Sequence, residues 1–169
     1  MKAMKTMLII ILVIVLAIAA MFFVGAMMGG DKDRGQAVDF TVTTIMDASF
    51  TLSQNYEKSG TVLVFFDRAT AQSPALLENL GATVKGKNVK FVLVAVGETD
   101  QAALAIYLSE AGVAPDVVIA DGKREVAEKY NINSCPVTYF INSTGSVRQV
   151  SLSNLNPDTA EKYLGFIDK

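Results

Sequence analysis

The chain contains no histidine and no tryptophan, and it has a single cysteine, Cys135. The absence of histidine removes the commonest general base and the commonest metal ligand. One cysteine can form neither an internal disulfide nor a Cys/His metal cluster. A serine nucleophile would also have no evident base. We therefore expect no metal site and no cofactor.

Positive charge is also scarce. The chain has 15 Lys and Arg against 17 Asp and Glu, a net charge of −2. Without Lys2 and Lys5, which precede a long apolar run, 13 basic and 17 acidic side chains remain, a net charge of −4. Nucleic-acid binding needs a basic patch, so we expect no nucleic-acid partner.

Residues 7–28 form an uninterrupted run of 22 residues without a charge. A membrane-spanning helix needs about 20 apolar residues, whereas the apolar core of a cleaved signal peptide has about 7–15. The run predicts a transmembrane anchor, an uncleaved signal-anchor, with cleavage as the alternative. Residues 1–6 are then a short tail and residues 29–37 a polar linker.

The orientation of this span rests on little charge. Lys2 and Lys5 precede it and Lys32 and Arg34 follow it, so only the terminal amine favours an inside N-terminus. A long domain behind an N-terminal anchor is usually translocated. We expect a single-pass membrane protein with its domain on the extracytoplasmic side.

Residues 38–169 alternate between strand and helix patterns. Apolar or alternating runs predict strands. These are residues 38–44, 50–52, 61–66, 90–96, 117–120, 137–141 and 147–152. Cap residues and apolar spacing predict helices. These begin at Ser73-Pro74, after Thr99 (ending at Gly112), over 123–130, and after Asn156. The order predicts one α/β domain with a mixed sheet flanked by helices.

The most informative stretch is residues 131–142, Asn-Ile-Asn-Ser-Cys-Pro-Val-Thr-Tyr-Phe-Ile-Asn. Pro136 opens an apolar strand pattern, where a residue without an N–H is tolerated. A helix pattern ending at Tyr130 precedes it, and a turn at Gly145 follows the strand. This stretch, the run Val62–Phe66 and the order of elements resemble the thioredoxin superfamily. The similarity covers roughly Phe40 to Asp168 and is closest to the membrane-anchored redoxin branch (TlpA-like and AhpC/TSA proteins).

The resemblance implies a thioredoxin-like fold, an N-terminal hairpin over residues 40–60 and a cis-proline at Pro136. It also implies a redox Cys-x-x-Cys where the loop after Val62–Phe66 enters the first helix. This sequence has Thr70-Ala71-Gln72-Ser73 there, so both sulfurs are missing. A helix N-terminus stabilises a thiolate, but a serine hydroxyl has no comparable acidity. We therefore expect neither dithiol exchange nor peroxide reduction at these four residues.

Cys135 directly precedes Pro136, and the resemblance places it beside Thr70 on a surface that pairs with extended peptides. It is either a small, partly buried apolar residue or a single reactive thiol that forms mixed disulfides. One thiol cannot complete an intramolecular dithiol cycle. The turn residues Asn142-Ser143-Thr144 match a glycosylation acceptor pattern, but a turn explains the same residues.

Three functions remain open. The first is a non-catalytic protein-binding or scaffold module that holds a partner segment in a groove at Cys135 and Pro136. The second is an enzyme, a single-cysteine thiol-disulfide oxidoreductase acting through Cys135. The third is a structural subunit of a membrane complex. Whether the chain is an enzyme is therefore open.

Overall fold

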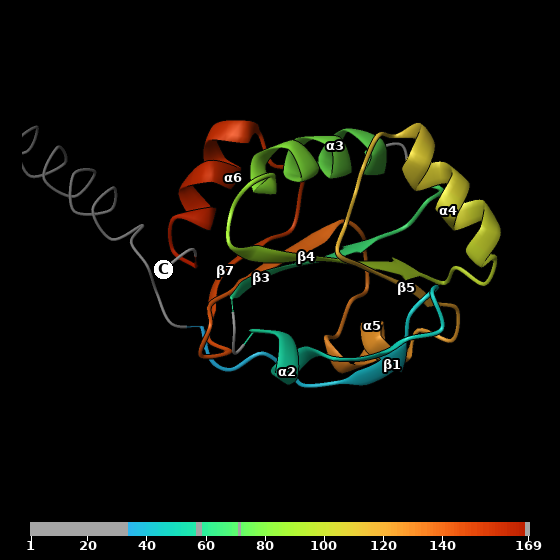
Figure 1. Ribbon diagram of the computed structural model, residues 1–169, viewed down its shortest axis with the longest axis horizontal. Coiled ribbons are helices and arrows are strands. Elements are labelled where there is room, and N and C mark those ends of the chain that lie inside the picture. Colours follow the sequence, from blue (N-terminus) through green and yellow to red (C-terminus); the bar gives the residue numbers. More distant parts are fainter. Residues whose placement is uncertain (1–33, 57–58, 71, 168–169) are drawn as a thin grey trace, which may run out of the picture. The chain divides into compact units, whose positions relative to one another are not determined.

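The computed structural model describes residues 34–56, 59–70 and 72–167 (Figure 1). The tail predicted over residues 1–6 and the membrane span predicted over residues 7–28 lie outside the described residues. Within the described ranges, no helix is both long enough and apolar enough to cross a bilayer.

A five-stranded mixed sheet forms the centre of the domain, in the order β5-β4-β3-β6-β7. Its strands are β3 (Gly60–Phe66), β4 (Val89–Val96), β5 (Val117–Asp121), β6 (Val137–Ile141) and β7 (Val147–Ser151). The first three are parallel, and β6 and β7 are antiparallel to their neighbours. This confirms the predicted α/β architecture with a mixed sheet.

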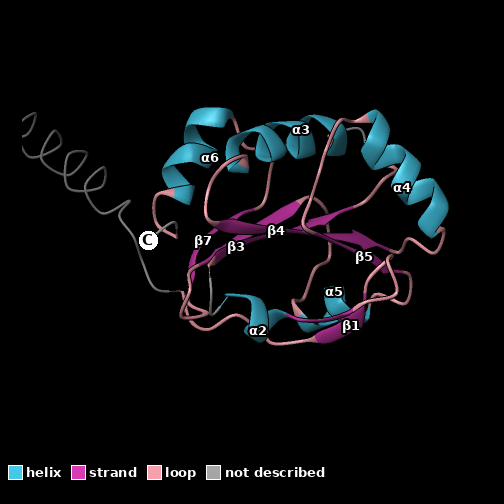
Figure 2. Ribbon diagram, in the orientation of Figure 1, coloured by secondary structure: helices cyan, strands magenta, loops and turns pink. Residues whose placement is uncertain are grey.

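Both faces of the sheet are covered (Figures 1 and 2). One face carries α3 (Ser73–Val84), α4 (Gln101–Glu110) and α6 (Pro157–Leu164). The other carries α2 (Leu52–Tyr56), α5 (Glu125–Lys129) and the antiparallel hairpin of β1 (Thr41–Thr43) and β2 (Ser49–Thr51). The hairpin expected over residues 40–60 is therefore present, with a short helix following it.

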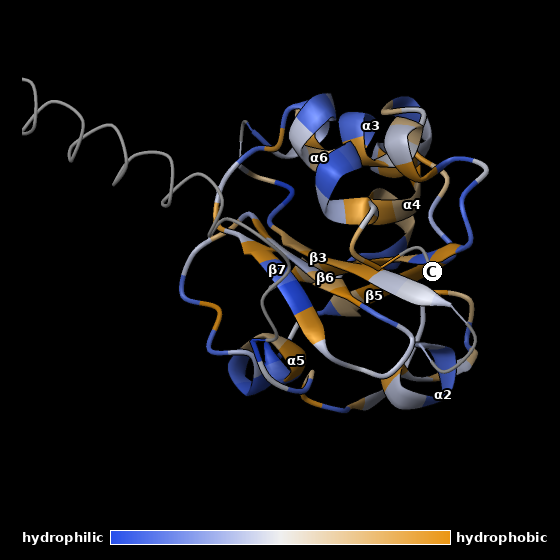
Figure 3. Ribbon diagram, turned by 90° about the vertical axis from the view of Figure 1, so that its left-hand side faces the viewer, coloured by the Kyte–Doolittle hydropathy of each residue, from blue (hydrophilic) through white to orange (hydrophobic). Residues whose placement is uncertain are grey.

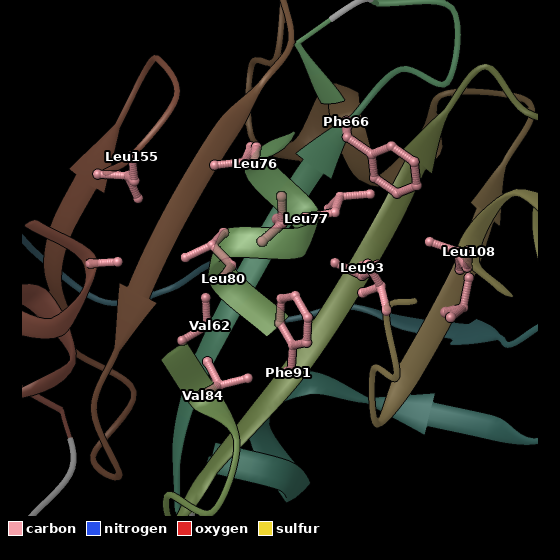
Figure 4. Close-up of a cluster of buried hydrophobic side chains, with 14 of the residues drawn as sticks. Val62, Phe66, Leu76, Leu77, Leu80, Val84, Phe91, Leu93, Leu108 and Leu155 are labelled. Carbon is pink, nitrogen blue, oxygen red and sulfur yellow. The ribbon is translucent and has the colours of Figure 1, made fainter. Parts of the chain in front are cut away.

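The side chains of β3 alternate between two apolar cores. Val62, Val64 and Phe66 face α3, whereas Leu63 and Phe65 face the hairpin layer. Every residue of β3 is buried, as a continuous apolar run predicts for a strand covered on both faces. Figure 4 shows the first core, where leucines of α3 lie over β3 and β4. In Figure 3 the strands are hydrophobic and much of the outer helix surface is hydrophilic.

The first predicted strand is shorter than residues 38–44. Val38 is 46% exposed, and only Thr41–Thr43 forms strand β1. The expected extended piece over residues 50–52 also ends early, because Leu52 begins α2. The carboxylate of Asp39 accepts the N–H of Ser53 at 2.9 Å and its hydroxyl at 2.7 Å. This side chain caps the helix start and ends the extended run.

Two of the predicted helix starts were one residue out of place. Helix α4 is capped by Asp100, whose Oδ1 accepts the N–H of Ala103 at 2.9 Å, and not by Thr99. The N-terminus of α3 is also shifted, as described with the site below. The predicted start of α6 is confirmed, since Asn156 Oδ1 accepts the N–H of Thr159 at 2.8 Å. Gly112 follows α4 with a φ of 64°, the left-handed conformation that glycine allows.

Residues 34–37, which fall in the predicted linker, pair with the turn between β6 and β7. The N–H of Ala37 donates to the carbonyl of Gly145 at 2.8 Å, and the N–H of Val147 donates to that of Gly35 at 2.8 Å. The N–H of Arg34 returns a bond to Val147 at 2.9 Å. The chain therefore enters the domain along the outer edge of β7.

Candidate functional site

The peptide bond between Cys135 and Pro136 is cis, as the resemblance implied, and it leads into β6. In the antiparallel register of β3 and β6, Phe65 pairs with Val137. Pro136 therefore lies at the end of the sheet where β3 finishes. The loop that follows β3, residues 67–72, leaves from the same end, so the structure brings the Cys135 and Thr70 segments together.

The loop after β3 is closed by bonds around Asp67. Its carboxylate Oδ1 accepts the N–H of Ala69 at 2.8 Å. Its main-chain carbonyl accepts the N–H of Thr70 at 3.0 Å and the hydroxyl of Ser73 at 2.8 Å. The Thr70 carbonyl in turn accepts the N–H of Ser73 at 3.0 Å. These bonds form a tight turn that delivers the chain into α3.

Ser73 is the first residue of α3, and the prediction that it is the N-cap was wrong. Gln72 holds the cap position with φ −85° and ψ −17°, and its side chain makes no capping bond. The hydroxyl of Ser73 is fully buried and points back to the carbonyl of Asp67. Thr70 is half-buried and Gln72 is exposed, while Ala71 lies outside the described residues. The hydroxyl nearest the helix start is therefore a structural donor.

The thiol of Cys135 is half-buried and packs against the apolar core that faces α5. Burial raises its pKa, the negative charge of Asp67 raises it further, and Arg124 opposes these effects. Desolvation and a nearby like charge both disfavour the thiolate. Since the thiolate is the nucleophile, this environment makes Cys135 less reactive than a free cysteine.

Arg124 holds the segment that leads to Cys135. Its Nη2 donates to the carbonyl of Ile132 at 2.8 Å, and its own backbone has a φ of 61°. On the other side of the site, Arg68 and Glu98 form an ion pair at 2.6 Å that joins the loops after β3 and β4. The sequence did not predict Arg68, Glu98 or Arg124, because these contacts join separate loops and leave no spacing pattern.

The main chain of Cys135 is unpaired. Within residues 34–56, 59–70 and 72–167, neither its N–H nor its C=O takes part in a hydrogen bond. Regular pairing with β3 begins only at Val137. Pro136 itself is buried, so Cys135 offers a donor and an acceptor at the lip of the sheet.

Hollows and charged groups give no sign of a metal or cofactor site at this position. A hollow of about 180 Å³ lies beside the loop after β3 and is lined by residues 67–69 and 96–98. A larger one, about 460 Å³, lies between β1 and the loops after β4 and β5, and Cys135 is not among its lining residues. In the described part of the chain, no three His, Cys, Asp or Glu side chains are grouped to bind a metal ion.

Comparison with solved structures finds many thioredoxin-like proteins. A secreted disulfide oxidoreductase of Mycobacterium tuberculosis, homologous to E. coli DsbE, is 20% identical, with a TM-score of 0.65 over 75% of this chain and 94% of that chain. A thiol:disulfide interchange protein of the thioredoxin family from Chlorobium tepidum TLS is 15% identical, with a TM-score of 0.69 over 83% and 100%. A peroxiredoxin-like protein from Aquifex aeolicus is 15% identical, with a TM-score of 0.65 over 80% and 88%. At these identities the likeness shows the fold alone.

A search of curated protein sequences finds no match to the chain. The sequence profile of the AhpC/TSA family, in contrast, matches residues 34–150, which is more than half of the chain. This range includes the loop after β3, the Cys135–Pro136 bond and most of the sheet. The chain therefore belongs to the AhpC/TSA family.

Proposed function

We propose that this protein is a membrane-anchored, extracytoplasmic thioredoxin-like protein without a redox dithiol, and that it binds an extended segment of a partner protein. The binding groove lies between the loop after β3 and the Cys135–Pro136 segment. Thr70, Ala71, Gln72 and Ser73 occupy the position of the missing dithiol. The apolar run over residues 7–28 supplies the anchor.

The absence of dithiol chemistry follows from the residues present. A dithiol cycle needs two sulfurs, and the sequence has one cysteine. The hydroxyl of Ser73 is buried and donates to the Asp67 carbonyl, so it is not presented to a substrate. A serine in this setting has no adjacent base that could activate it.

The unpaired main chain of Cys135 carries the binding proposal. An extended segment laid beside it would accept its N–H and donate to its C=O, the mode by which strands add to an exposed sheet edge. The neighbouring exposed side chains of Gln72, Asn133 and Ser134 are uncharged. Such a surface favours recognition through backbone pairing over recognition through an ion pair.

The alternative is a single-cysteine oxidoreductase that acts through Cys135 with an external thiol. The half-exposed sulfur is the observation in its favour. The raised pKa of Cys135 counts against it, since the thiolate is disfavoured by burial and by Asp67. Disulfide reduction by the purified protein with a small thiol, lost on Cys135→Ala, would establish this alternative in place of the binding role.

The binding proposal is tested by photocrosslinking from the single cysteine. A benzophenone maleimide attached to Cys135 in native membranes should crosslink a defined partner protein. The matched control is Cys135→Ser combined with Ser109→Cys, which moves the probe to an exposed position on α4. A crosslinked partner seen only from position 135 supports the groove. The same products from both positions, or none from position 135, would refute it.

The anchor has its own test. We expect the full chain to stay with membranes through alkaline carbonate extraction, because 22 uncharged residues are enough to span the bilayer. Release of the intact chain into the supernatant would exclude a spanning segment.

A further inference from the structure

Asn142 lies in the turn between β6 and β7 and has a side chain that the fold uses only in part. Its Oδ1 accepts three bonds, from the N–H of Thr144 at 3.1 Å, the hydroxyl of Thr144 at 2.8 Å and the N–H of Ser146 at 2.9 Å. Its amide nitrogen, Nδ2, makes no hydrogen bond to any residue of the described ranges. The turn therefore needs the oxygen of this side chain and leaves the NH₂ group unused.

The turn does not require asparagine. An aspartate could accept the same three bonds, and carboxylates accept such bonds strongly. Asparagine is also favoured where the backbone is left-handed, but the left-handed residue of this turn is Gly145, with a φ of 80°. Asn142 is not among the residues with positive φ. Neither the turn bonds nor the backbone conformation explains why an amide is present.

The missing explanation lies in the sequence Asn142-Ser143-Thr144, the acceptor pattern for N-linked glycosylation. Asn142 is half-exposed and Thr144 is exposed at the tip of the turn. The hydroxyl of Thr144 donates to the Asn142 oxygen, so it draws electron density away from the amide and makes the Nδ2 protons more acidic. The turn thus polarises the nitrogen that such a modification uses.

We propose that Asn142 is an N-glycosylation site, modified by a membrane oligosaccharyltransferase from a lipid-diphosphate-linked oligosaccharide. Nδ2 attacks the anomeric carbon of the sugar and loses one proton, so that an N–C bond forms. The bond from that carbon to the diphosphate oxygen breaks, and the lipid diphosphate leaves with the electron pair. No oxidation or reduction occurs. The inference rests on the extracytoplasmic location proposed above, because such donors transfer their sugars on that side of the membrane.

The test is mass spectrometry of the full chain purified from the membranes of its native cells. The wild-type protein and Ser143→Ala, which keeps the acceptor pattern, should carry a mass excess made of whole sugar residues on the peptide containing Asn142. Asn142→Asp keeps the acceptor oxygen of the turn and removes the nucleophilic amide. Thr144→Val removes the hydroxyl. Both variants should have the mass predicted from sequence.

A parallel measurement separates the two proposals. A membrane-impermeant amine reagent applied to intact cells reports whether the domain lysines, such as Lys85, face outward. If they react and Asn142 is unmodified, the glycosylation inference fails and the location stands. If they are protected until the cells are opened, the proposed location fails and the inference falls with it. Sugar that persists on Asn142→Asp would also overturn the inference.

Discussion

Replacing Thr138 by valine should stabilise the protein. Thr138 lies on β6, two residues after Pro136, and its side chain is fully buried. Its hydroxyl oxygen is a buried polar atom with no hydrogen-bond partner in the described part of the chain. An unsatisfied buried polar group costs about 1–3 kcal/mol, and valine has nearly the same shape without that group. We expect Thr138→Val to raise the free energy of unfolding by about 1 kcal/mol.

The gain is measured by chemical denaturation followed by circular dichroism, or as a rise of roughly 3–5 °C in Tm for a domain of this size. Thr44→Val is the matched control. Thr44 is also buried, but its Oγ1 accepts the N–H groups of Met46 and Ala48, each at 3.3 Å. The same substitution should therefore destabilise by about 1 kcal/mol at Thr44. If Thr138→Val also lowers the unfolding free energy by this amount, the claim that its hydroxyl is unsatisfied is wrong.

Two further predictions concern the site and the turn. Asp67→Asn should lower the pKa of Cys135, because it removes the negative charge that raises it, and Arg124→Gln should raise that pKa; alkylation rates measured against pH report both, and equal profiles would contradict the charge argument. Gly145→Ala should destabilise by about 2 kcal/mol or more, because an L-residue at φ 80° costs about 1–2 kcal/mol and its Cβ would lie 2.6 Å from Cζ of Tyr56; Tyr56→Ala in that background should recover only the clash, and full recovery would show that the backbone is not strained.

The sheet could be predicted from the sequence because its strands are covered on both faces. Burial on both sides demands continuous apolar runs, and the runs at residues 61–66, 90–96 and 137–141 correspond to β3, β4 and β6 within one residue at each end. The edge hairpin was harder. There, Val38 fits an alternating pattern yet is exposed, because the Asp39 cap redirects the chain into α2.

Helix starts were predicted only approximately, for a physical reason. Around both α3 and α4, neighbouring residues offer side chains that can cap, and local sequence does not decide which one will. Asp100 caps α4 in place of Thr99. Ser73 is instead drawn inward, because the turn after β3 places the Asp67 carbonyl within 2.8 Å of its hydroxyl. The position of a hydroxyl at a site depends on such tertiary geometry.

The single cysteine shows why a residue type alone did not settle the function. Its position before Pro136 could be read from the sequence, but the reactivity of its sulfur depends on groups from other loops. Asp67 comes from the loop after β3 and Arg124 from the turn after β5, and they act on the thiol in opposite directions. With burial added, the balance favours the protonated thiol. The main-chain N–H and C=O of the same residue are unpaired among the described residues and do not titrate. Whatever the pH, Cys135 can thus offer its backbone to a partner, whereas its sulfur would need an increase in thiolate that the surrounding charges oppose.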